Sequence, residues 1–451
     1  MTRKVSLRVF TICLILVSVF GLSACSSGDK GGKGKVELTW LVRSDPVLKP
    51  WEEKMVKEFE AEHPDIKIKL QEIPQEQIDQ KLQTMIAGGN VPDVWSANWA
   101  DSGFATYQGL GALLDLSPYI EKDPDAVEGI DEKLIDIYTI DGKKYGVPIL
   151  AMGSYVFYNK ELFDEAGLEY PPTNWDDESY WDDESWNYDT MVEYAKKLTK
   201  NIGDKNNQVF GLLNTNHGNR DAWLWGGDLF KAEAYETGDI GEPNVLEEPA
   251  NRQAIQAHYD LIHKHKVSPT QSQLDAVSQI GDPFLTGRVA MTINGGWGVR
   301  SYQPAEFQWG IAPVPYTVDE RRIPMYVDPW NISAKSKHPD EAWEFIKFLT
   351  DPEKGAKALV EMTNETPANS QLMDLWLDHV AEQAGMTNEQ LKELHEGAIR
   401  YGFEADNHLI RNFSTILNTI NQNVNAIYDG TKDIDEGLED LDTQLRAAGD
   451  K

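Results

Sequence analysis

From residue 36 onward, the pattern of hydrophobic and polar positions alternates between strand-like and helix-like segments. Val36–Val42 is an apolar run of the β type, Trp51–His63 has helical spacing, and apolar residues alternate in Ile66–Leu70. A strand, a helix and a second strand in this order are typical of an α/β protein. A helix over Asn159–Ala166 is expected to end at Gly167, a usual C-cap residue. The last third of the chain is predicted to be mostly helical. Its helices are expected at Pro339–Leu349, Asp351–Met362, Asn388–Arg400, Leu409–Tyr428 and Asp433–Ala448.

One segment, Pro171–Tyr188, interrupts this pattern. It contains a near-repeat, Trp175–Ser179 followed by Trp181–Ser185, which is too short to indicate a solenoid. We expect an exposed loop, followed by a helix at Tyr188–Thr199. Tryptophans at helical spacing with apolar neighbours are instead predicted to lie in the core: Trp51, Trp343 and Trp376.

The N-terminal segment has the features of a bacterial lipoprotein signal. Positive charges at Arg3, Lys4 and Arg8 precede the apolar run Val9–Gly21, which is shorter than the roughly 20 residues of a membrane-spanning helix. Leu-Ser-Ala-Cys25 follows and matches a lipobox. The sequence therefore predicts that residues 1–24 are removed and that Cys25 carries lipid. Residues 25–35 would form a flexible tether. The alternative is an ordinary secretory signal with a chance cysteine at the cleavage point.

Charge and cysteine content narrow the function classes. The chain has 42 Lys and Arg against 74 Asp and Glu, a formal net charge of −32, and no local window forms a basic patch. This balance argues against nucleic-acid binding. Cys13 lies in the leader and Cys25 is assigned to lipid, so we expect no disulfide, no thiol nucleophile and no cysteine metal site. The length of the chain after the leader and the tether, residues 36–451, favours two domains.

Several short motifs occur in order along the chain. They are Ala87–Val94, Tyr145–Pro148, Tyr158–Phe163 with Ala166–Leu168, Phe284–Met291 with Asn294–Trp297, and Ile332–Lys337 leading into Ala342–Ile346. Each motif is weak alone. As an ordered set on a lipoprotein, they resemble the extracellular solute-binding proteins of ABC importers, in the sugar-binding family that includes maltose-binding protein.

The resemblance implies an α/β protein with a two-lobed, periplasmic-binding-protein-like fold. A multi-strand hinge would join the lobes, and ligand would lie in the cleft between them. The first lobe would comprise residues 36–147 plus 327–372, and the second residues 148–326 plus 373–451. Because the lobes could close over a ligand, the implied activity is capture of a solute and its delivery to a membrane permease.

A sugar site needs planar rings for the C–H face of the ligand and polar groups for its hydroxyl edge. Trp and polar side chains that follow predicted strands are therefore the candidates, because ligands lie at the ends of strands in open α/β sheets. Trp297, after the strand in Gly287–Ile293, is the strongest candidate, although it could also be a core residue under a loop. The other candidates are Arg43 and Asp45, then Asn98, Trp99 and Asp101, then Arg220, Trp223 and Trp225, and finally Trp330.

Some of these choices have plainer alternatives. Arg43 and Asp45 could simply pair with each other, a contact of at most ~1 kcal/mol at the surface. The Trp residues of the insertion could cover the mouth of the cleft, but we expect them to belong to a solvated loop: Trp175, Trp181 and Trp186. An anionic sugar would be bound by cationic side chains: Arg43, Arg220 or Arg300.

The sequence thus predicts a lipid-anchored, monomeric binding protein on the extracytoplasmic face of the cell membrane, on a Gram-positive surface. It would capture a carbohydrate, an oligosaccharide in the first instance, for the permease of an ABC importer. We expect no cofactor, metal or nucleic acid. The alternative is a surface-anchored, glycoside-active enzyme, although no Gly-x-Ser-x-Gly, His-Glu-x-x-His or phosphate-binding glycine loop is present. A structural or adhesive lipoprotein is disfavoured because the chain has no stalk-like repeats.

Overall fold

The computed structural model describes residues 35–449, with the exception of residues 176–185, 205, 217 and 319. The leader, Cys25 and nearly all of the tether lie outside the described residues, as do Trp181 and most of the near-repeat. Within the described part of the chain, no helix combines the length and the apolar character needed to cross a membrane.

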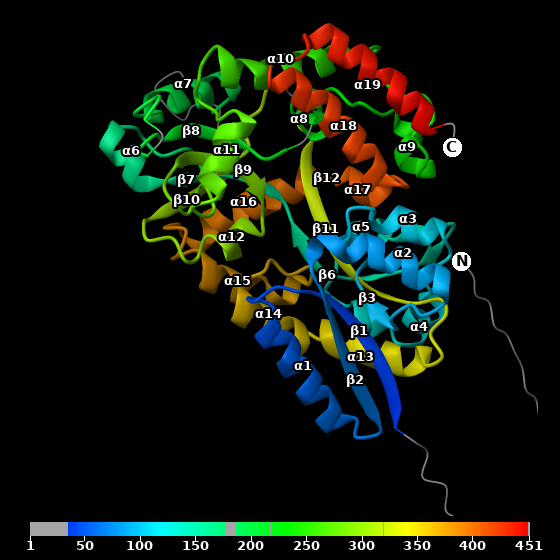
Figure 1. Ribbon diagram of the computed structural model, residues 1–451. Coiled ribbons are helices and arrows are strands. Elements are labelled where there is room, and N and C mark those ends of the chain that lie inside the picture. Colours follow the sequence, from blue (N-terminus) through cyan, green and yellow to red (C-terminus); the bar gives the residue numbers. More distant parts are fainter. Residues whose placement is uncertain (1–34, 176–185, 205, 217, 319, 450–451) are drawn as a thin grey trace, which may run out of the picture. The chain divides into compact units, whose positions relative to one another are not determined.

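Two main sheets organise residues 36–449, and the first has six strands in the order β12-β11-β3-β1-β2, with β6 paired to β11 (Figure 1). Its strands are β1 (Val36–Arg43), β2 (Ile66–Ile73), β3 (Val94–Trp95), β6 (Val147–Met152), β11 (Ile323–Ile332) and β12 (Gly402–Glu404). β1 runs parallel to β2 and β3, whereas β11 is antiparallel to β3 and β6. The apolar residues of β1 are buried on both faces, as in a sheet covered by helices on both sides.

Helices from two distant parts of the chain surround this first sheet. They are α1 (Lys49–Glu62), α2 (Ile78–Gly88), α3 (Gly103–Gly109), α4 (Ser117–Lys122), α5 (Glu132–Asp136), α13 (Pro339–Thr350) and α14 (Gly355–Thr363), with a small hairpin of β4 (Thr139–Ile140) and β5 (Lys143–Lys144). At the centre of this core, the ring of Trp40 contacts Trp51, Trp330 and Phe345 edge-on, with centroids 5.1 to 5.7 Å away.

The second sheet has four strands in the order β10-β7-β9-β8. They are β7 (Ser154–Asn159), β8 (Phe210–Asn214), β9 (Val289–Gly295) and β10 (Trp309–Pro313). The helices associated with it are α6 (Lys160–Ala166), α7 (Tyr188–Leu198), α8 (Gly218–Leu224), α9 (Ala232–Thr237), α10 (Pro249–His263), α11 (Gln271–Ser278), α12 (Gly298–Ser301), α15 (Met373–Val380), α16 (Asn388–Arg400), α17 (Asp406–Leu409), α18 (Phe413–Tyr428) and α19 (Ile434–Gly449).

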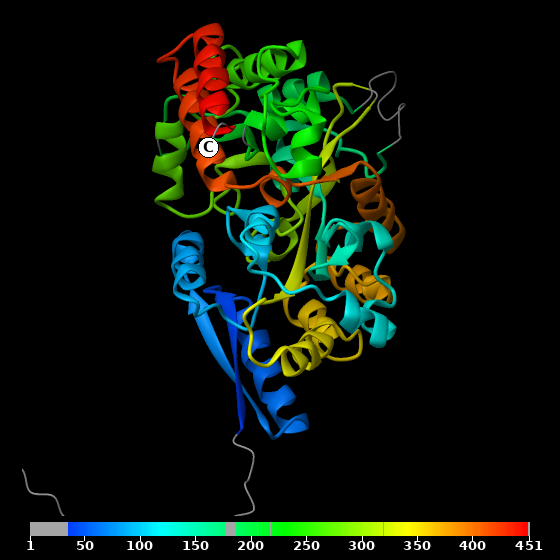
Figure 2. The ribbon, with the colours of Figure 1, turned by 90° about the vertical axis from the view of Figure 1, so that its right-hand side faces the viewer.

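We call the first sheet with its helices the first lobe, and the second sheet with its helices the second lobe. The chain passes from one to the other at Gly153, between β6 and β7. It passes again along β11, whose first residue, Ile323, lies in the core of the second lobe while Ile332 lies in that of the first. Figure 2 shows β11 as the long yellow-green strand that runs between the lobes. The architecture is therefore the expected two-lobed α/β fold.

The buried tryptophans test the expectations about the core. Trp51, Trp343 and Trp376 are buried, which confirms their assignment. The expectation of a solvated loop was wrong for Trp175 and Trp186, which are only 4% and 3% exposed. Each indole N–H donates to a backbone carbonyl at 2.8 Å, that of Leu394 for Trp175 and that of Pro313 for Trp186. Because a satisfied N–H removes the cost of burying an indole, these rings can extend the core of the second lobe.

Candidate ligand-binding site

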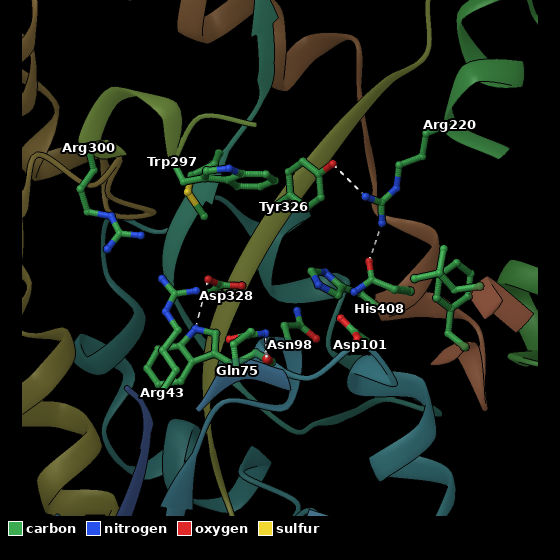
Figure 3. Close-up of a pocket in the computed structure, with 15 residues that line it drawn as sticks. Arg43, Gln75, Asn98, Asp101, Arg220, Trp297, Arg300, Tyr326, Asp328 and His408 are labelled. Atoms are coloured by element: carbon green, nitrogen blue, oxygen red, sulfur yellow. Dashed lines mark hydrogen bonds between the residues drawn. The ribbon is translucent and has the colours of Figure 1, made fainter. Parts of the chain in front are cut away.

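A cavity of about 380 Å³ lies between the two lobes and receives side chains from both (Figure 3). Its volume is within the range of small-molecule sites. The first lobe and β11 contribute Arg43, Gln75, Asn98, Trp99, Asp101, Met152, Tyr326 and Asp328. The second lobe contributes Arg220, Trp297, Arg300, Asn407, His408, Phe413 and Leu417. Many of these residues lie at the end of a strand or in a short helix, so the ends of several secondary-structure elements meet at this cavity.

Aromatic rings line the cavity from both sides. Trp297 follows β9 and packs against Tyr326 of β11, with ring centroids 4.7 Å apart and planes inclined by 68°. Trp99 ends the short 3₁₀ helix η2 (Ala97–Trp99), and its Nε1 donates to Oδ2 of Asp328 at 3.3 Å. Its ring rests edge-on against the buried Trp330. These contacts hold the rings at defined angles, which is what a planar ligand face requires.

A cluster of charges lies at one end of the cavity. Nη1 of Arg300 contacts Oδ2 of Asp45 at 2.5 Å, and its Nε lies 2.9 Å from Oε1 of Glu365. Nε of Arg43 lies 3.8 Å from the same Asp45 oxygen. Burial alone would raise the pKa of Asp45, but the hydrogen bond and charge of Arg300 outweigh it and hold the pKa below its ordinary value. The ion pairs join the first lobe to α12 of the second.

Burial acts differently on the other acids of this cluster. It raises the pKa of Asp328 from an ordinary 3.8 to about 6, although Arg43 opposes the rise. Burial likewise raises the pKa of Glu365, against the opposing charge of Arg300. Desolvation penalises the charged form, so these carboxyl groups hold their protons more strongly than they would in water.

Arg220 of α8 anchors the other end of the cavity. Its Nε donates to Oδ1 of Asp406 at 3.0 Å, its Nη1 to the Tyr326 hydroxyl at 3.0 Å, and its Nη2 to Oδ1 of Asn407 at 2.8 Å. Figure 3 shows the guanidinium held between β11 and the segment that carries His408. This network holds α8 of the second lobe against β11.

Next to this network, His408 and Glu404 form a buried pair through Nδ1 and Oε1. Burial lowers the pKa of His408 to about 3 and raises the pKa of Glu404 well above its ordinary value. Asp101 is exposed at the rim, and burial together with the charge of Asp79 raises its pKa. The site therefore offers neutral polar groups as well as charged ones.

The structure places six of the ten Trp and polar candidates in the lining: Arg43, Asn98, Trp99, Asp101, Arg220 and Trp297. Arg300, which the sequence suggested only for an anionic sugar, lines the cavity as well. The amide of Asn98 is already engaged, because its Nδ2 donates to the Tyr138 hydroxyl and to the Val327 carbonyl while its Oδ1 accepts from the Phe104 N–H. Asp45 lies just outside the lining and reaches the cavity through Arg300. Its pairing with Arg43 exists, but the contact with Arg300 is much shorter.

Three further candidates lie away from the cavity. Trp223 is fully buried under Phe403, with ring centroids 5.3 Å apart, and donates to Asp228. Trp225 packs against the core of the second lobe, and Trp330 is buried between Trp40 and Trp99. Helix α8 ends at Leu224, so Trp223 in its last turn and Trp225 beyond it do not share the position of Arg220 at the cavity.

Sequence reasoning missed other lining residues: Gln75, Met152, Tyr326, Asp328, Asn407, His408, Phe413 and Leu417. A usable signal existed for Tyr326 and Asp328, because they alternate on one face of a strand that is mostly apolar. A carboxylate within such a strand is costly unless it has a partner or a function. No comparable signal marks Asn407 and His408, which occupy a short helix between β12 and α18.

Comparisons with known proteins agree with this geometry. Residues 45–356 match the family model described as bacterial extracellular solute-binding protein. The chain is 25% identical to a maltodextrin-binding protein of Bacillus subtilis over 371 residues, covering 80% of each chain. It is 27% identical to a galactooligosaccharide-binding protein of the same organism over 383 residues, covering 82% of this chain and 81% of the relative.

Solved structures show the same two-lobed fold. An ABC substrate-binding protein of Listeria monocytogenes in complex with cycloalternan superposes with a TM-score of 0.75 at 25% identity, covering 92% of this chain and 99% of that one. A maltose-bound protein of T. maritima superposes with a TM-score of 0.70 at 20% identity, covering 92% of this chain and 100% of that one.

Proposed function

Because the chain belongs to the bacterial extracellular solute-binding protein family, we propose that it captures a carbohydrate in this cavity and delivers it to the permease of an ABC importer. The observation that carries the proposal is the combination of Trp99, Trp297 and Tyr326 with hydrogen-bonding side chains around one cavity between two lobes. Such rings pack on the C–H faces of sugars, while carboxylates, amides and guanidinium groups bind hydroxyls. Relatives that bear the names of maltodextrin- and galactooligosaccharide-binding proteins support the same ligand class.

The charges of the site favour a neutral sugar over an anionic one. Each guanidinium in the lining has a carboxylate partner: Arg43 has Asp45, Arg300 has Asp45 and Glu365, and Arg220 has Asp406. An anionic ligand would have to compete with these carboxylates, and several of them would be left without a partner in a buried place. A neutral hydroxyl can use the remaining donors and acceptors without breaking an ion pair.

Ligand capture would be coupled to closure of the two lobes. Binding shifts the population toward the closed form only if the ligand has greater affinity for that form. Rings on both sides of the cavity provide such a difference, because Trp99 belongs to the first lobe and Trp297 to the second. The lobe boundaries that we propose are residues 36–147 plus 327–372 for the first lobe and residues 148–326 plus 373–451 for the second, with the exception of residues 148–152 of β6 and 402–404 of β12, which belong with the first sheet.

The remaining parts of the proposal concern the location and state of the protein. The leader motif supports removal of residues 1–24, lipidation of Cys25 and attachment to the outer face of the cell membrane. A lipid anchor together with an acidic body favours a Gram-positive surface over a periplasm. We propose that the protein acts as a monomer, without a cofactor and without enzymatic activity. The family consists of transport proteins, which supports a binding role over a hydrolytic one.

A thermal-shift screen of the chain from residue 26 onward tests the proposal. The panel contains maltotriose, galactotriose, arabinotriose and a trigalacturonate, and the same wells are assayed for new reducing ends. A ligand at about 100 times its Kd adds ~2.7 kcal/mol to the folded state, which raises Tm by a few degrees. A shift by a neutral sugar without new reducing ends supports the proposal. New reducing ends would make the protein a glycoside-active enzyme, and a shift by the uronate alone would contradict the preference for neutral ligands.

A further inference from the structure

A second cavity, of about 460 Å³, adjoins the ligand cavity in the second lobe. It lies between the C-terminal end of β8 and helices α10, α11 and α18. Its lining includes Asn214, Thr215, Asn216, His258, Gln271, Leu417, Asn421, Asn425 and Tyr428. Leu417 lines both cavities, so they meet at this side chain.

Helix α18 connects the two cavities along one face. Phe413 and Leu417 line the first cavity, while Leu417, Asn421, Asn425 and Tyr428 line the second. Residues spaced by three or four lie on the same side of a helix, so these side chains form one continuous strip. The helix packs against α8, which carries Arg220 of the ligand site (Figure 1).

The second sheet provides a second connection. Strands β8 and β9 are parallel, so their C-terminal ends lie at the same edge of the sheet. Thr215, which follows β8, donates from Oγ1 to the Ile293 carbonyl at 2.7 Å and lies 3.5 Å from Oδ1 of Asn294. Asn294 comes three residues before Trp297. The second cavity therefore begins next to Asn294, at the start of the segment that leads to Trp297 in the ligand site.

The lining of the second cavity is rich in amides. An amide offers both donors and an acceptor, which matches hydroxyl groups that do the same. Asn216 is the most informative, because its Nδ2 is buried and has no hydrogen-bond partner among the residues that the structure describes. A buried donor without a partner costs free energy, and a ligand oxygen would recover it.

Two stacked rings also line this cavity. The rings of His258 and Tyr428 stack with centroids 4.1 Å apart and planes inclined by 11°. Asp221 holds both, through Nδ1 of His258 at 2.8 Å and the Tyr428 hydroxyl at 3.3 Å. Asp221 therefore holds the two rings in place, and the amide side chains of α18 line the same cavity.

We propose that this second cavity extends the sugar site and holds the further units of an oligosaccharide whose first units lie between Trp99 and Trp297. The inference rests on the proposed function and adds to it a ligand longer than one cavity holds. Short sugars occupy the first cavity alone. Longer members of the same series also contact Asn216 and Asn421.

Titration calorimetry with malto-, galacto- and arabino-oligosaccharide series of about two to seven units tests this. The binding series should gain at least about tenfold in affinity with length before a plateau. The variant Asn421→Ala should lose about fivefold or more for the longest member and nothing for the shortest. Gln422→Ala is the matched control, because Gln422 carries an exposed amide on the same helix and does not line the cavity.

The outcomes separate the two proposals. Affinity that is independent of length, or an Asn421→Ala loss that is equal for short and long members, overturns the extension and leaves sugar binding intact. If no member of any series binds, the proposed function fails and the extension fails with it. Thermal unfolding of both variants shows whether the fold is retained, and an Asn216→Ala variant repeats the test at a second position.

Discussion

Replacement of Asp328 by Asn should change how ligand affinity depends on pH. Asp328 lies in β11, lines the cavity and is 6% exposed, and it accepts the hydrogen bond of the Trp99 indole at 3.3 Å. Asn has nearly the same shape and can still accept that bond through Oδ1. The pKa of Asp328 is set by the burial of this side chain and by the neighbouring charges of Arg43, Glu365 and Arg300. The substitution therefore removes a charge and leaves the cavity volume unchanged.

The magnitude follows from the raised pKa. With a pKa of about 6, Asp328 is mostly ionised at pH 7.5, whereas at pH 5 only about one molecule in ten carries the charge. A carboxylate accepts a hydroxyl hydrogen bond more strongly than a neutral group, by roughly 1 to 1.5 kcal/mol. We therefore expect Asp328→Asn to weaken binding about tenfold at pH 7.5. As the pH falls from 7.5 to 5, the affinity of the native protein for the sugar should fall by up to about tenfold and approach the affinity of the variant.

The stability of the free protein should move in the opposite direction. The folded state holds the Asp328 proton more strongly than the unfolded chain, so the contribution of this group to stability is fully present below pH 3.8 and is lost as the pH rises through the window from 3.8 to about 6. At about 1.4 kcal/mol per pH unit, the loss is roughly 3 kcal/mol above that window. Asp328→Asn should therefore raise Tm at pH 7.5, which also shows that the fold is intact.

Titration calorimetry at several pH values between 5 and 7.5 measures the affinity of the native protein and of Asp328→Asn for the sugar that gives the largest thermal shift in the screen. Comparison at each pH cancels the contribution of Glu365, whose pKa burial also raises. A gap between the two proteins that stays constant from pH 7.5 to pH 5 would refute the reasoning. An affinity of the native protein that does not change with pH would refute it as well.

Three further predictions concern single residues. Trp297→Ala should weaken sugar binding by about 1.5–3 kcal/mol, roughly ten- to a hundredfold by calorimetry, because the ring is lost from the cavity, and unchanged affinity would remove Trp297 from the site. Glu52 is 1% exposed, its carboxylate oxygens have no hydrogen-bond partner among the described residues, and burial raises its pKa from 4.5 to about 8. The contribution of Glu52 to the free energy of unfolding should therefore fall by roughly 5 kcal/mol as the pH rises from 4.5 to 8, and urea unfolding of Glu52→Gln should show a correspondingly different pH dependence; equal slopes contradict this. In Gly103→Ala, a Cβ would lie 1.9 Å from the Asn407 carbonyl oxygen at a φ of 64°, so the urea midpoint should fall far more than in Gly111→Ala, which has the same φ and open space; equal losses would show that backbone strain alone is responsible.

Elements with their own end signals could be predicted closely from the sequence. Helix α16 spans Asn388–Arg400 as expected, and it begins at a capping box formed by Thr387 and Gln390. Helix α6 ends at Gly167, which adopts a φ of 65°. The expected helix Leu409–Tyr428 is instead divided, because Asn412 has a φ of 55° and separates α17 from α18. Local signals therefore located helices well where caps are strong and failed where one residue breaks a periodic pattern.

The candidate site could be predicted only in part, because similar local patterns lead to different environments. Trp297 and Trp330 both stand beside polar residues at strand ends in the sequence, yet only Trp297 reaches the cavity. Trp330 is turned inward by the pairing of β11 with β6 and β3, which places its ring against Trp40. Sheet register depends on contacts between distant segments, so no window around Trp330 contains the information.

The charge cluster shows the same limit for polar residues. Arg300 and Asp45 are 255 residues apart, and Arg220 and Asp406 are 186 apart, yet these pairs define both ends of the cavity. The position of Asp45 after the first strand marks it as a site candidate in the sequence, but its short ion pair is with Arg300 of the other lobe. Because that pair spans the two lobes, it contributes to the stability of this arrangement as well as to the charge of the site. Sequence position can indicate which edge of a sheet a charged residue occupies, but the partner that sets its pKa and its freedom to bind ligand is decided by the packing of the lobes.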